Sequence, residues 1–186
     1  DHQIAIAYKA IADIFNKAAG RLLTRIEILD LINWLGTVLS SRRSAEICLM
    51  AHGEPEWQEF STAKLNCGAT GNPQRYQSNN TLLFYEKPSR DDLRHVFALM
   101  EQAGGSQPGF ANAAEALRRA PWFRGFNPCA EILLGDKSFC NLVELVLFRF
   151  NGDLKALLRA AQIIARANYR QTCVWLDDGI LQRSWH

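Results

Sequence analysis

Apolar residues recur at helical spacing in two stretches near the start of the chain. Residues 3–19 carry an apolar residue at nearly every third or fourth position, and Gly20 follows as a plausible stop. A second helix is expected from Thr24, because Thr24 and Glu27 have the spacing of a capping box. Apolar residues continue to Leu39. The pattern therefore predicts two consecutive N-terminal helices.

Shorter apolar runs further along the chain predict strands. The runs "AEICLMA" (45–51) and "NTLLFYE" (80–86) are bounded by polar segments, as buried strands are. The segments 130–134 and 140–148 are also strand-like, and residues 172–176 suggest a last short strand.

Helical patterns alternate with these strands. A helix is expected from Ser89, a good N-cap, to residue 103, and a strong amphipathic helix over 153–169. Residues 53–78 are mostly loop with a short helix near 56–64, and 104–126 predict a turn, a short helix and another loop. Alternating strands and helices are typical of the α/β class.

The composition favours one soluble domain. The chain has 186 residues, 48% of them apolar, which is enough for a hydrophobic core. Lys plus Arg is 21 and Asp plus Glu is 19, so the formal net charge is +2. This balance argues against a strongly basic surface for nucleic acid, whereas a small anion such as a nucleotide needs only a local cluster.

Location signals favour the cytoplasm and exclude a membrane partner. No apolar run approaches the roughly 18 residues of a membrane helix, and the N-terminus does not resemble a signal peptide. The chain lacks a starting methionine, which suggests a piece of a longer protein. Its five cysteines are odd in number and widely spaced, unlike a secreted disulfide framework. The sequence contains no CxxC motif, so no structural zinc site is expected.

The densest candidate chemistry lies in the stretch that contains Cys129 and Glu131. If the backbone is extended there, side chains two residues apart point the same way, and a thiol and a carboxylate face one pocket. Pro128 opposes a helix and removes a backbone donor, which favours an irregular loop. Reactive groups often lie on such loops.

A second thiol, Cys140, follows eleven residues after Cys129. A simple hairpin turning at "GDKS" would pair Cys140 with Leu133 and leave the two sulfurs roughly 13 Å apart. A finger-like loop brings them together better, with Cys129 at its tip and a new strand starting at Cys140. The alternative is that cysteines act as small buried hydrophobes, and Cys48, Cys67 and Cys173 are assigned to it.

The stretch "NPCAEI" (127–132), followed by "CNLVE" (140–144), resembles the active-site loop of ribonucleotide reductases. The eleven-residue step between the cysteines is similar to the adenosylcobalamin-dependent class, especially its monomeric triphosphate-reducing branch. Supporting segments occur in the order of that family: "RRSAEI" (42–47), "RYQSNNTLLF" (75–84), "QPGFAN" (107–112) and "ANYRQTCVWLDDGILQR" (167–183). The resemblance covers nearly the whole chain.

This resemblance implies a role for each residue of the loop. Cys129 would become the thiyl radical that removes the 3′ hydrogen of the ribose, and Glu131 would act as general base on the 3′ hydroxyl. Asn127 would hold the substrate through its amide. Cys140 would be one of the two thiols that reduce the 2′ position and end as a disulfide.

The resemblance also implies a specificity loop at about 39–45, in which Ser41, Arg42, Arg43 and Ser44 couple the effector to the substrate base. Two guanidinium groups beside small polar residues suit phosphate or base contacts. The other interpretation of the arginines is a solvated pair at a helix end.

The fold implied is part of the ten-stranded α/β barrel of ribonucleotide reductases. Residues 1–186 would form a partial catalytic barrel domain with an inserted finger loop at about 125–139. The N-terminal and C-terminal parts of the full enzyme would be missing, including the partner of Cys140. We therefore expect the chain alone not to turn over.

The implied cofactor is adenosylcobalamin. The implied partners are a ribonucleoside di- or triphosphate, a dNTP or ATP effector, a thioredoxin-type reductant and the remaining segments of the reductase. Two alternatives stay open: a fragment of a di-iron-dependent ribonucleotide reductase, and a non-catalytic nucleotide-binding or assembly fragment that docks through unpaired strand edges.

Overall fold

The computed structural model describes residues 2–38, 46–138 and 142–175, which form two compact units, 1–133 and 134–186. The first unit holds the sheet, and its elements in chain order are α1 (His2–Lys17), α2 (Arg25–Gly36), β1 (Glu46–Ala51), α3 (Trp57–Ser61), the 3-10 helix η1 (Pro73–Tyr76), β2 (Ser78–Phe84), α4 (Arg90–Ala103), β3 (Gly109–Asn112), α5 (Ala113–Arg119) and β4 (Gly125–Phe126). The boundary between the units falls within β5 (Leu133–Leu134), which pairs with β4.

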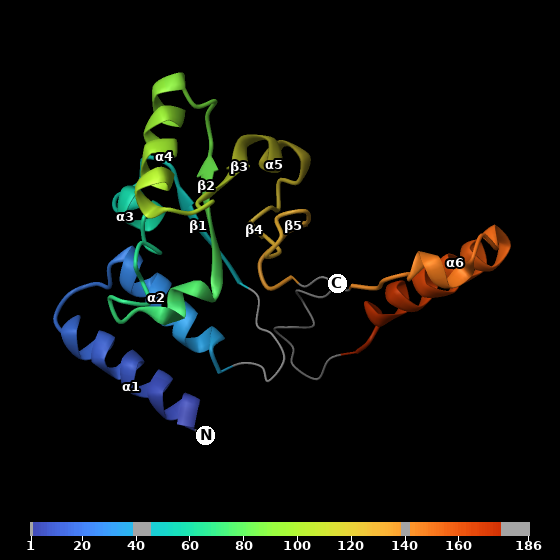
Figure 1. Ribbon diagram of the computed structural model, residues 1–186, viewed down its shortest axis with the longest axis horizontal. Helices are drawn as coiled ribbons and strands as arrows, with labels where there is room; N and C mark the ends of the chain where they lie inside the picture. Colours follow the sequence, from blue (N-terminus) through green and yellow to red (C-terminus); the bar gives the residue numbers. More distant parts are fainter. Residues whose placement is uncertain (1, 39–45, 139–141, 176–186) are drawn as a thin grey trace. The chain divides into compact units, whose positions relative to one another are not determined.

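The centre of the first unit is a parallel three-stranded sheet in the order β1-β2-β3 (Figure 1). Glu46 pairs with Ser78 at the start of β1, and the register continues without a slip to Ala51 and Leu83. Helices connect the strands, as parallel pairing requires. The predicted α/β class is confirmed as a mixed α/β arrangement with a parallel sheet.

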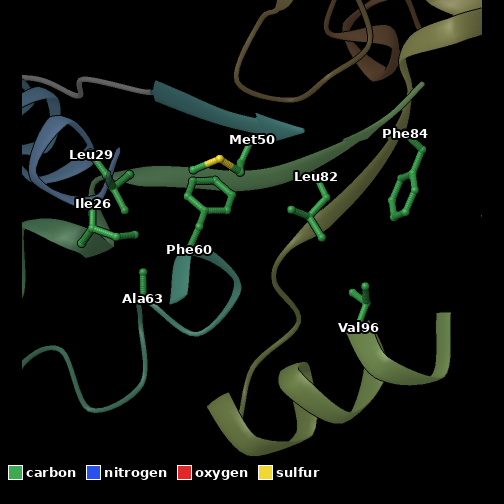
Figure 2. Close-up of a cluster of buried hydrophobic side chains, with 8 residues drawn as sticks. All are labelled: Ile26, Leu29, Met50, Phe60, Ala63, Leu82, Phe84 and Val96. Carbon is green, nitrogen blue, oxygen red and sulfur yellow. The ribbon is translucent and has the colours of Figure 1, made fainter. Parts of the chain in front are cut away.

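One face of the sheet packs against helices α2, α3 and α4. Met50 of β1 and Leu82 of β2 face this layer, and Phe60 of α3 and Val96 of α4 are buried against them (Figure 2). Leu82 and Val96 are completely buried. This cluster is the main core of the unit, so the packing that holds the sheet together lies on its helix-covered face.

The opposite face of the sheet carries a different set of side chains. Since side chains alternate along a strand, Leu83 points away from the helix layer, together with Ala111 of β3. These two residues and the partly buried Phe126 of β4 form a second, smaller cluster. Figure 1 shows α5 and β4 on this side of the strands. We call this side, which carries Leu83 and Ala111, the open face of the sheet. The segment that holds Cys129 therefore follows a strand, β4, that packs on the open face.

Local sequence signals fix the starts of two helices where they were expected. The Thr24 hydroxyl accepts a hydrogen bond from the backbone N–H of Glu27, and the Glu27 carboxylate accepts one from the backbone N–H of Thr24. Ser89 and Asp92 form the same capping box at the start of α4. Both boxes satisfy backbone donors that a helix start leaves without partners.

The strand prediction needs correction at several places. The segment Gly109–Asn112, expected as turn or loop, is strand β3, because β2 offers it a ladder to complete. In 130–134, only Leu133–Leu134 are paired. Residues 142–146 have no regular structure and 147–150 form the 3-10 helix η2 (Leu147–Phe150), so the strand predicted over 140–148 is wrong for its described part.

The second unit contains η2 and the helix α6 (Leu154–Gln171). The helix predicted over 153–169 is confirmed, with the Asp153 side chain accepting from Ala156 N–H at its start. The strand suggested at 172–176 is absent from its described residues, 172–175. No helix in the described ranges has the length and apolar character needed to cross a membrane.

Candidate active-site loop

The loop from Asn127 to Ile132 is a tight turn that presents Cys129 to solvent. The backbone N–H of Ala130 donates to the carbonyl oxygen of Asn127 at 2.8 Å, which closes a four-residue turn. Pro128 occupies the second position, where its fixed φ is favourable. Ala130 then adopts a positive φ of 64°. The irregular loop expected from Pro128 is confirmed, and the extended geometry that would align Cys129 with Glu131 is not met at Ala130.

Asn127 holds the loop closed from inside. It is 4% exposed, and its Oδ1 accepts from the backbone N–H of Ile132 at 2.9 Å. Its own backbone N–H donates to the carbonyl of Ile132 at 3.4 Å. Because Oδ1 is committed to the loop, a substrate contact by this side chain would have to use Nδ2.

The two reactive groups of the loop are open to solvent. Cys129 is exposed with a free thiol, and Glu131 is exposed. Both side chains are therefore accessible from solvent, whereas the buried Asn127 side chain stabilises the backbone of the loop. Cys140, the predicted second thiol, lies outside the described residues.

Aromatic packing fixes the base of the loop. Phe126, the residue before Asn127, packs edge-on against Phe123 with ring centroids 4.8 Å apart. It also contacts the cluster of Leu83 and Ala111 on the open face of the sheet. The entry to the loop is thus attached to the core, which favours a defined position for the turn.

A side chain from β2 reaches the same turn. The Nδ2 group of Asn79 donates to the carbonyl oxygen of Pro128 at 2.7 Å, across 49 residues of sequence. Asn79 was not among the predicted site residues, although it lies in the segment "RYQSNNTLLF" on which the resemblance partly rests. That segment was the available signal, but residue type alone does not reveal a contact so distant in sequence.

The predicted specificity loop, with Ser41, Arg42, Arg43 and Ser44, lies outside the described residues. The elements on either side of it approach each other closely. A Cβ placed on Gly36, the last residue of α2, would clash with the side-chain carboxylate of Glu46, the first residue of β1. Glycine at position 36 therefore permits the helix and the strand to meet at the two ends of this segment.

The other cysteines have three different environments. Cys67 is completely buried and Cys48 is half-buried beside the main core, where burial raises the pKa of its thiol. Both fit the interpretation of cysteine as a small hydrophobe. Cys173 does not, because it is exposed. In the described part of the chain, no three His, Cys, Asp or Glu side chains gather closely enough to share a metal ion.

A large cavity lies elsewhere, at the carboxyl ends of β2 and β3. It measures about 800 Å³, and its walls include Phe84, Phe110 and Arg118. Arg118 is paired with Glu115 at 2.7 Å. Such a position is a common ligand site in open α/β sheets. Its lining includes no residue of 127–132, so this cavity is separate from the loop that holds Cys129.

Comparison with known proteins identifies relatives for this chain. A segment of the adenosylcobalamin-dependent ribonucleoside-triphosphate reductase of Lactobacillus gasseri is 29% identical over 177 residues, covering 87% of this chain and 23% of the relative. The enzyme of the same name from Levilactobacillus brevis is 32% identical over 154 residues, covering 73% of this chain and 19% of the relative.

A third reductase of the same name, from Lactobacillus helveticus, is 28% identical over 181 residues. The chain thus spans about a fifth of the length of the curated relatives that it matches. No family model matches the chain, and no solved structure matches it. The resemblance to adenosylcobalamin-dependent ribonucleotide reductases that the loop motif suggested is therefore confirmed by similarity along most of the chain.

Proposed function

We propose that this chain supplies the radical-site loop of an adenosylcobalamin-dependent ribonucleotide reductase and works as part of a longer or multi-segment enzyme. The observation that carries the proposal is the exposed, free thiol of Cys129 on a turn held by Asn127, within the motif that resembles the reductase loop. The similarity to three triphosphate reductases supports the reaction class.

Adenosylcobalamin, when bound, would supply the radical that Cys129 carries. The exposure of Cys129 fits this role, since transfer of a hydrogen atom requires direct access to the sulfur. The thiyl group would take the 3′ hydrogen atom of the ribose, forming an S–H bond and leaving a carbon-centred radical on the sugar. The cofactor would provide the difficult chemistry, and the chain would provide position and access.

The other loop residues would complete the reduction. Glu131 would accept the proton of the 3′ hydroxyl, and its exposed position leaves it free to meet a substrate. The 2′ hydroxyl would leave as water. Cys140 and a second thiol outside this chain would provide two electrons and two hydrogens, becoming a disulfide that a thioredoxin-type protein reduces again. Cys129 would recover its radical when the 3′ hydrogen returns to the sugar.

We further propose that the parallel strands β1, β2 and β3 are part of the ten-stranded barrel of such an enzyme. The loop region 125–139 would be its finger, and 1–186 would be a partial catalytic domain. On this view the chain alone is inactive, because the partner thiol of Cys140 and several strands come from other segments. The enzyme would act in the cytoplasm.

Recognition of nucleotides would involve the segment 39–45. In the sequence it lies between Gly36, the last residue of α2, and Glu46, the first residue of β1, and these two residues are close together. Arg42 and Arg43, with Ser41 and Ser44, would contact the effector, a dNTP or ATP, or the base of the substrate. The names of the relatives favour a ribonucleoside triphosphate as substrate, with a diphosphate as the other possibility to test.

The decisive experiment replaces Cys129 in the assembled enzyme, prepared with the segments that complete it. Deoxyribonucleotide formation is measured with adenosylcobalamin and a dithiol reductant. Cys129→Ser should abolish turnover, while Cys173→Ser, a matched change of another exposed cysteine, should leave it unchanged. Retained activity in Cys129→Ser would refute the radical-site assignment. Activity that needs a di-iron subunit in place of adenosylcobalamin would move the protein to that class.

A non-catalytic assembly role is the second candidate, and one observation favours it. Helix α6 has no buried residue in this chain, and apolar side chains such as Leu154 and Leu158 are exposed on it. An amphipathic helix of this kind generally packs against another element. In a pull-down with the complementary segments, binding that persists while Cys129→Ser retains full turnover would support assembly as the whole function.

A further inference from the structure

We infer that Asn79 and Gln107 are positioning residues for the Cys129 loop, forming a hydrogen-bonded relay that attaches the turn to the sheet. The importance of this relay for catalysis rests on the proposed function. Its effect on the loop itself does not, because the contacts are a property of the fold. Neither residue touches the reacting atoms in the proposed mechanism.

The relay has three bonds in sequence. Oε1 of Gln107 accepts from the backbone N–H of Asn80 in β2 at 2.9 Å. Nε2 of Gln107 donates to Oδ1 of Asn79 at 3.2 Å. Nδ2 of Asn79 donates to the carbonyl of Pro128 at 2.7 Å. The path therefore runs from the backbone of the central strand to the residue that immediately precedes Cys129.

Backbone groups at both ends determine the direction of every bond in this relay. The N–H of Asn80 can only donate, so the oxygen of Gln107 must face it and the amide nitrogen must face Asn79. The carbonyl of Pro128 can only accept, so Asn79 must present its nitrogen there and its oxygen to Gln107. The two amide orientations are thus mutually consistent, and either side chain in the reverse orientation would oppose like atoms.

The relay supplies something that the loop's internal bonds do not. The bonds from Ala130 to Asn127 and from Ile132 to Asn127 give the turn its shape, but they join the loop only to itself. Phe126 attaches the entry to the open face of the sheet. Asn79 attaches the turn itself, one residue from the sulfur. Small displacements of a reacting group cost rate steeply, so this attachment should matter for turnover.

The relay should therefore affect kcat more than KM. Losing the bond to Pro128 leaves the groups of the loop chemically intact but less well placed, which removes stabilisation from the transition state and not from initial binding. Replacing a residue that merely stabilised the sheet would lower the melting temperature without changing kcat relative to KM.

Two near-isosteric variants test the direction of the bonds. Asn79→Asp replaces the donor to Pro128 with an oxygen. Gln107→Glu retains an acceptor for Asn80 N–H but removes the donor to Asn79, which then turns its amide nitrogen towards the new carboxylate and its oxygen towards Pro128. Each should lower kcat about tenfold, the loss expected for one hydrogen bond, with KM nearly unchanged. The double variant should cost no more than either single change.

Asn79→Asp has a further signature in its pH profile. A protonated carboxyl group can donate to the Pro128 carbonyl, so its kcat relative to wild type should rise as the pH is lowered towards the pKa of the introduced acid. Asn79→Ala has no such group, and its relative kcat should stay constant over the same pH range. A purely structural role of position 79 would not separate these two variants.

A matched control is Asn112→Ala, on neighbouring strand β3. The side-chain oxygen of Asn112 also accepts one hydrogen bond, from the backbone N–H of Glu115, and no hydrogen bond described for this side chain joins it to the loop. This variant should have a lower melting temperature than wild type and an unchanged kcat. Hydrogen–deuterium exchange of the peptide spanning 125–134 gives the second readout. Exchange there should rise severalfold in Asn79→Ala and remain at the wild-type rate in Asn112→Ala.

The two proposals fail separately. If Cys129→Ser is inactive but Asn79→Asp and Gln107→Glu match wild type in kcat and loop exchange, the relay is refuted and the radical-site function stands. If the assembled protein makes no deoxyribonucleotide, the function is refuted, and exchange of 125–134 still decides whether Asn79 holds the loop. Equal rises of exchange in Asn79→Ala and Asn112→Ala would also refute the relay.

Discussion

Oδ1 of Asn127 accepts a hydrogen bond from the backbone N–H of Ile132 at 2.9 Å, which joins the first residue of the loop to its last. The side chain is nearly completely buried while the next reactive residue, Cys129, is exposed. A buried amide thus supports an exposed thiol, and the geometry of the turn depends on a hydrogen bond that is partly buried.

Replacing this amide should open the loop. In Asn127→Ala, the N–H of Ile132 loses its acceptor in a partly buried site, which should reduce the free energy of unfolding by about 1–2 kcal/mol. Chemical denaturation gives this loss, and amide exchange at Ile132 locates it. Asn127→Asp retains an acceptor at the same place and should preserve most of the stability. Equal destabilisation by both changes would contradict the assigned bond.

A second prediction concerns the ion pair that joins α2 to η1. Asp30 accepts from Nε and Nη2 of Arg75, each at 2.7 Å, and the two side chains are only 12% and 16% exposed. Asp30→Asn leaves the guanidinium without its charge partner and should lower the free energy of unfolding by about 2–3 kcal/mol.

The control for that pair is Asp91→Asn. Asp91 is bound to Arg94 at the same 2.7 Å, but both side chains are largely exposed, at 88% and 74%. Water screens this pair, so its loss should produce no measurable change in a denaturation curve. If the two variants behave alike, burial is not what strengthens the bond between Asp30 and Arg75.

A third prediction follows from the cap of α2. The Arg21 side chain, first, and the backbone N–H of Thr24 hold the pKa of Glu27 at about 2, below its ordinary value of 4.5. Because the folded-state pKa is the lower one, the stabilisation is complete above pH 4.5 and is lost as the pH falls from there towards 2. Thermal melting at a series of pH values should show this loss in wild type.

In Glu27→Gln the melting temperature should fall less steeply across that same acidic range, because the variant has no carboxylate to protonate at this position. Glu101→Gln, a change on an exposed part of α4, serves as control and should retain the wild-type slope. A wild-type slope in Glu27→Gln would mean that the carboxylate does not contribute to acid sensitivity.

Local signals predicted most of the helices and the central strands. The capping boxes at Thr24 and Ser89 involve residues three apart, so the chemistry that sets a helix start is visible in a short window of sequence. The apolar runs of β1 and β2 are likewise distinctive, because β2 is almost entirely buried and β1 is mostly half-buried in a parallel sheet. For these elements the local preference and the tertiary environment agree.

Strand β3 and the segment 142–148 show where local patterns fail. The sequence "GFAN" has a glycine and an asparagine in four residues, which local propensity does not favour, yet β2 supplies the ladder that makes it a strand. Residues 142–148 are apolar enough for a strand, but the described residues of the second unit contain no strand beyond the β5 boundary to pair with them. Strand formation depends on a neighbour, which periodicity does not reveal.

The irregular loop of the candidate site was predictable from the sequence, but the side chain that attaches it to the sheet was not. The roles that the motif gives to Cys129, Glu131 and Asn127 stay predictions, whereas the irregular loop that Pro128 indicated is present. The contribution of Asn79 depends on a side chain that crosses 49 residues of sequence to meet one carbonyl. Contacts of this kind follow from the register of the sheet, which only the folded chain defines.

The alternation of faces along β2 limits how this gene can change length. Leu82 belongs to the helix-covered core, whereas Asn79 and Leu83 belong to the open face that carries the loop. Inserting or deleting a single codon within β2 would exchange the two faces and remove Leu82 and Phe84 from the helix-covered core. Natural length variation among relatives of this chain should therefore accumulate in the loops around the strand, such as 62–72, and spare the strand itself.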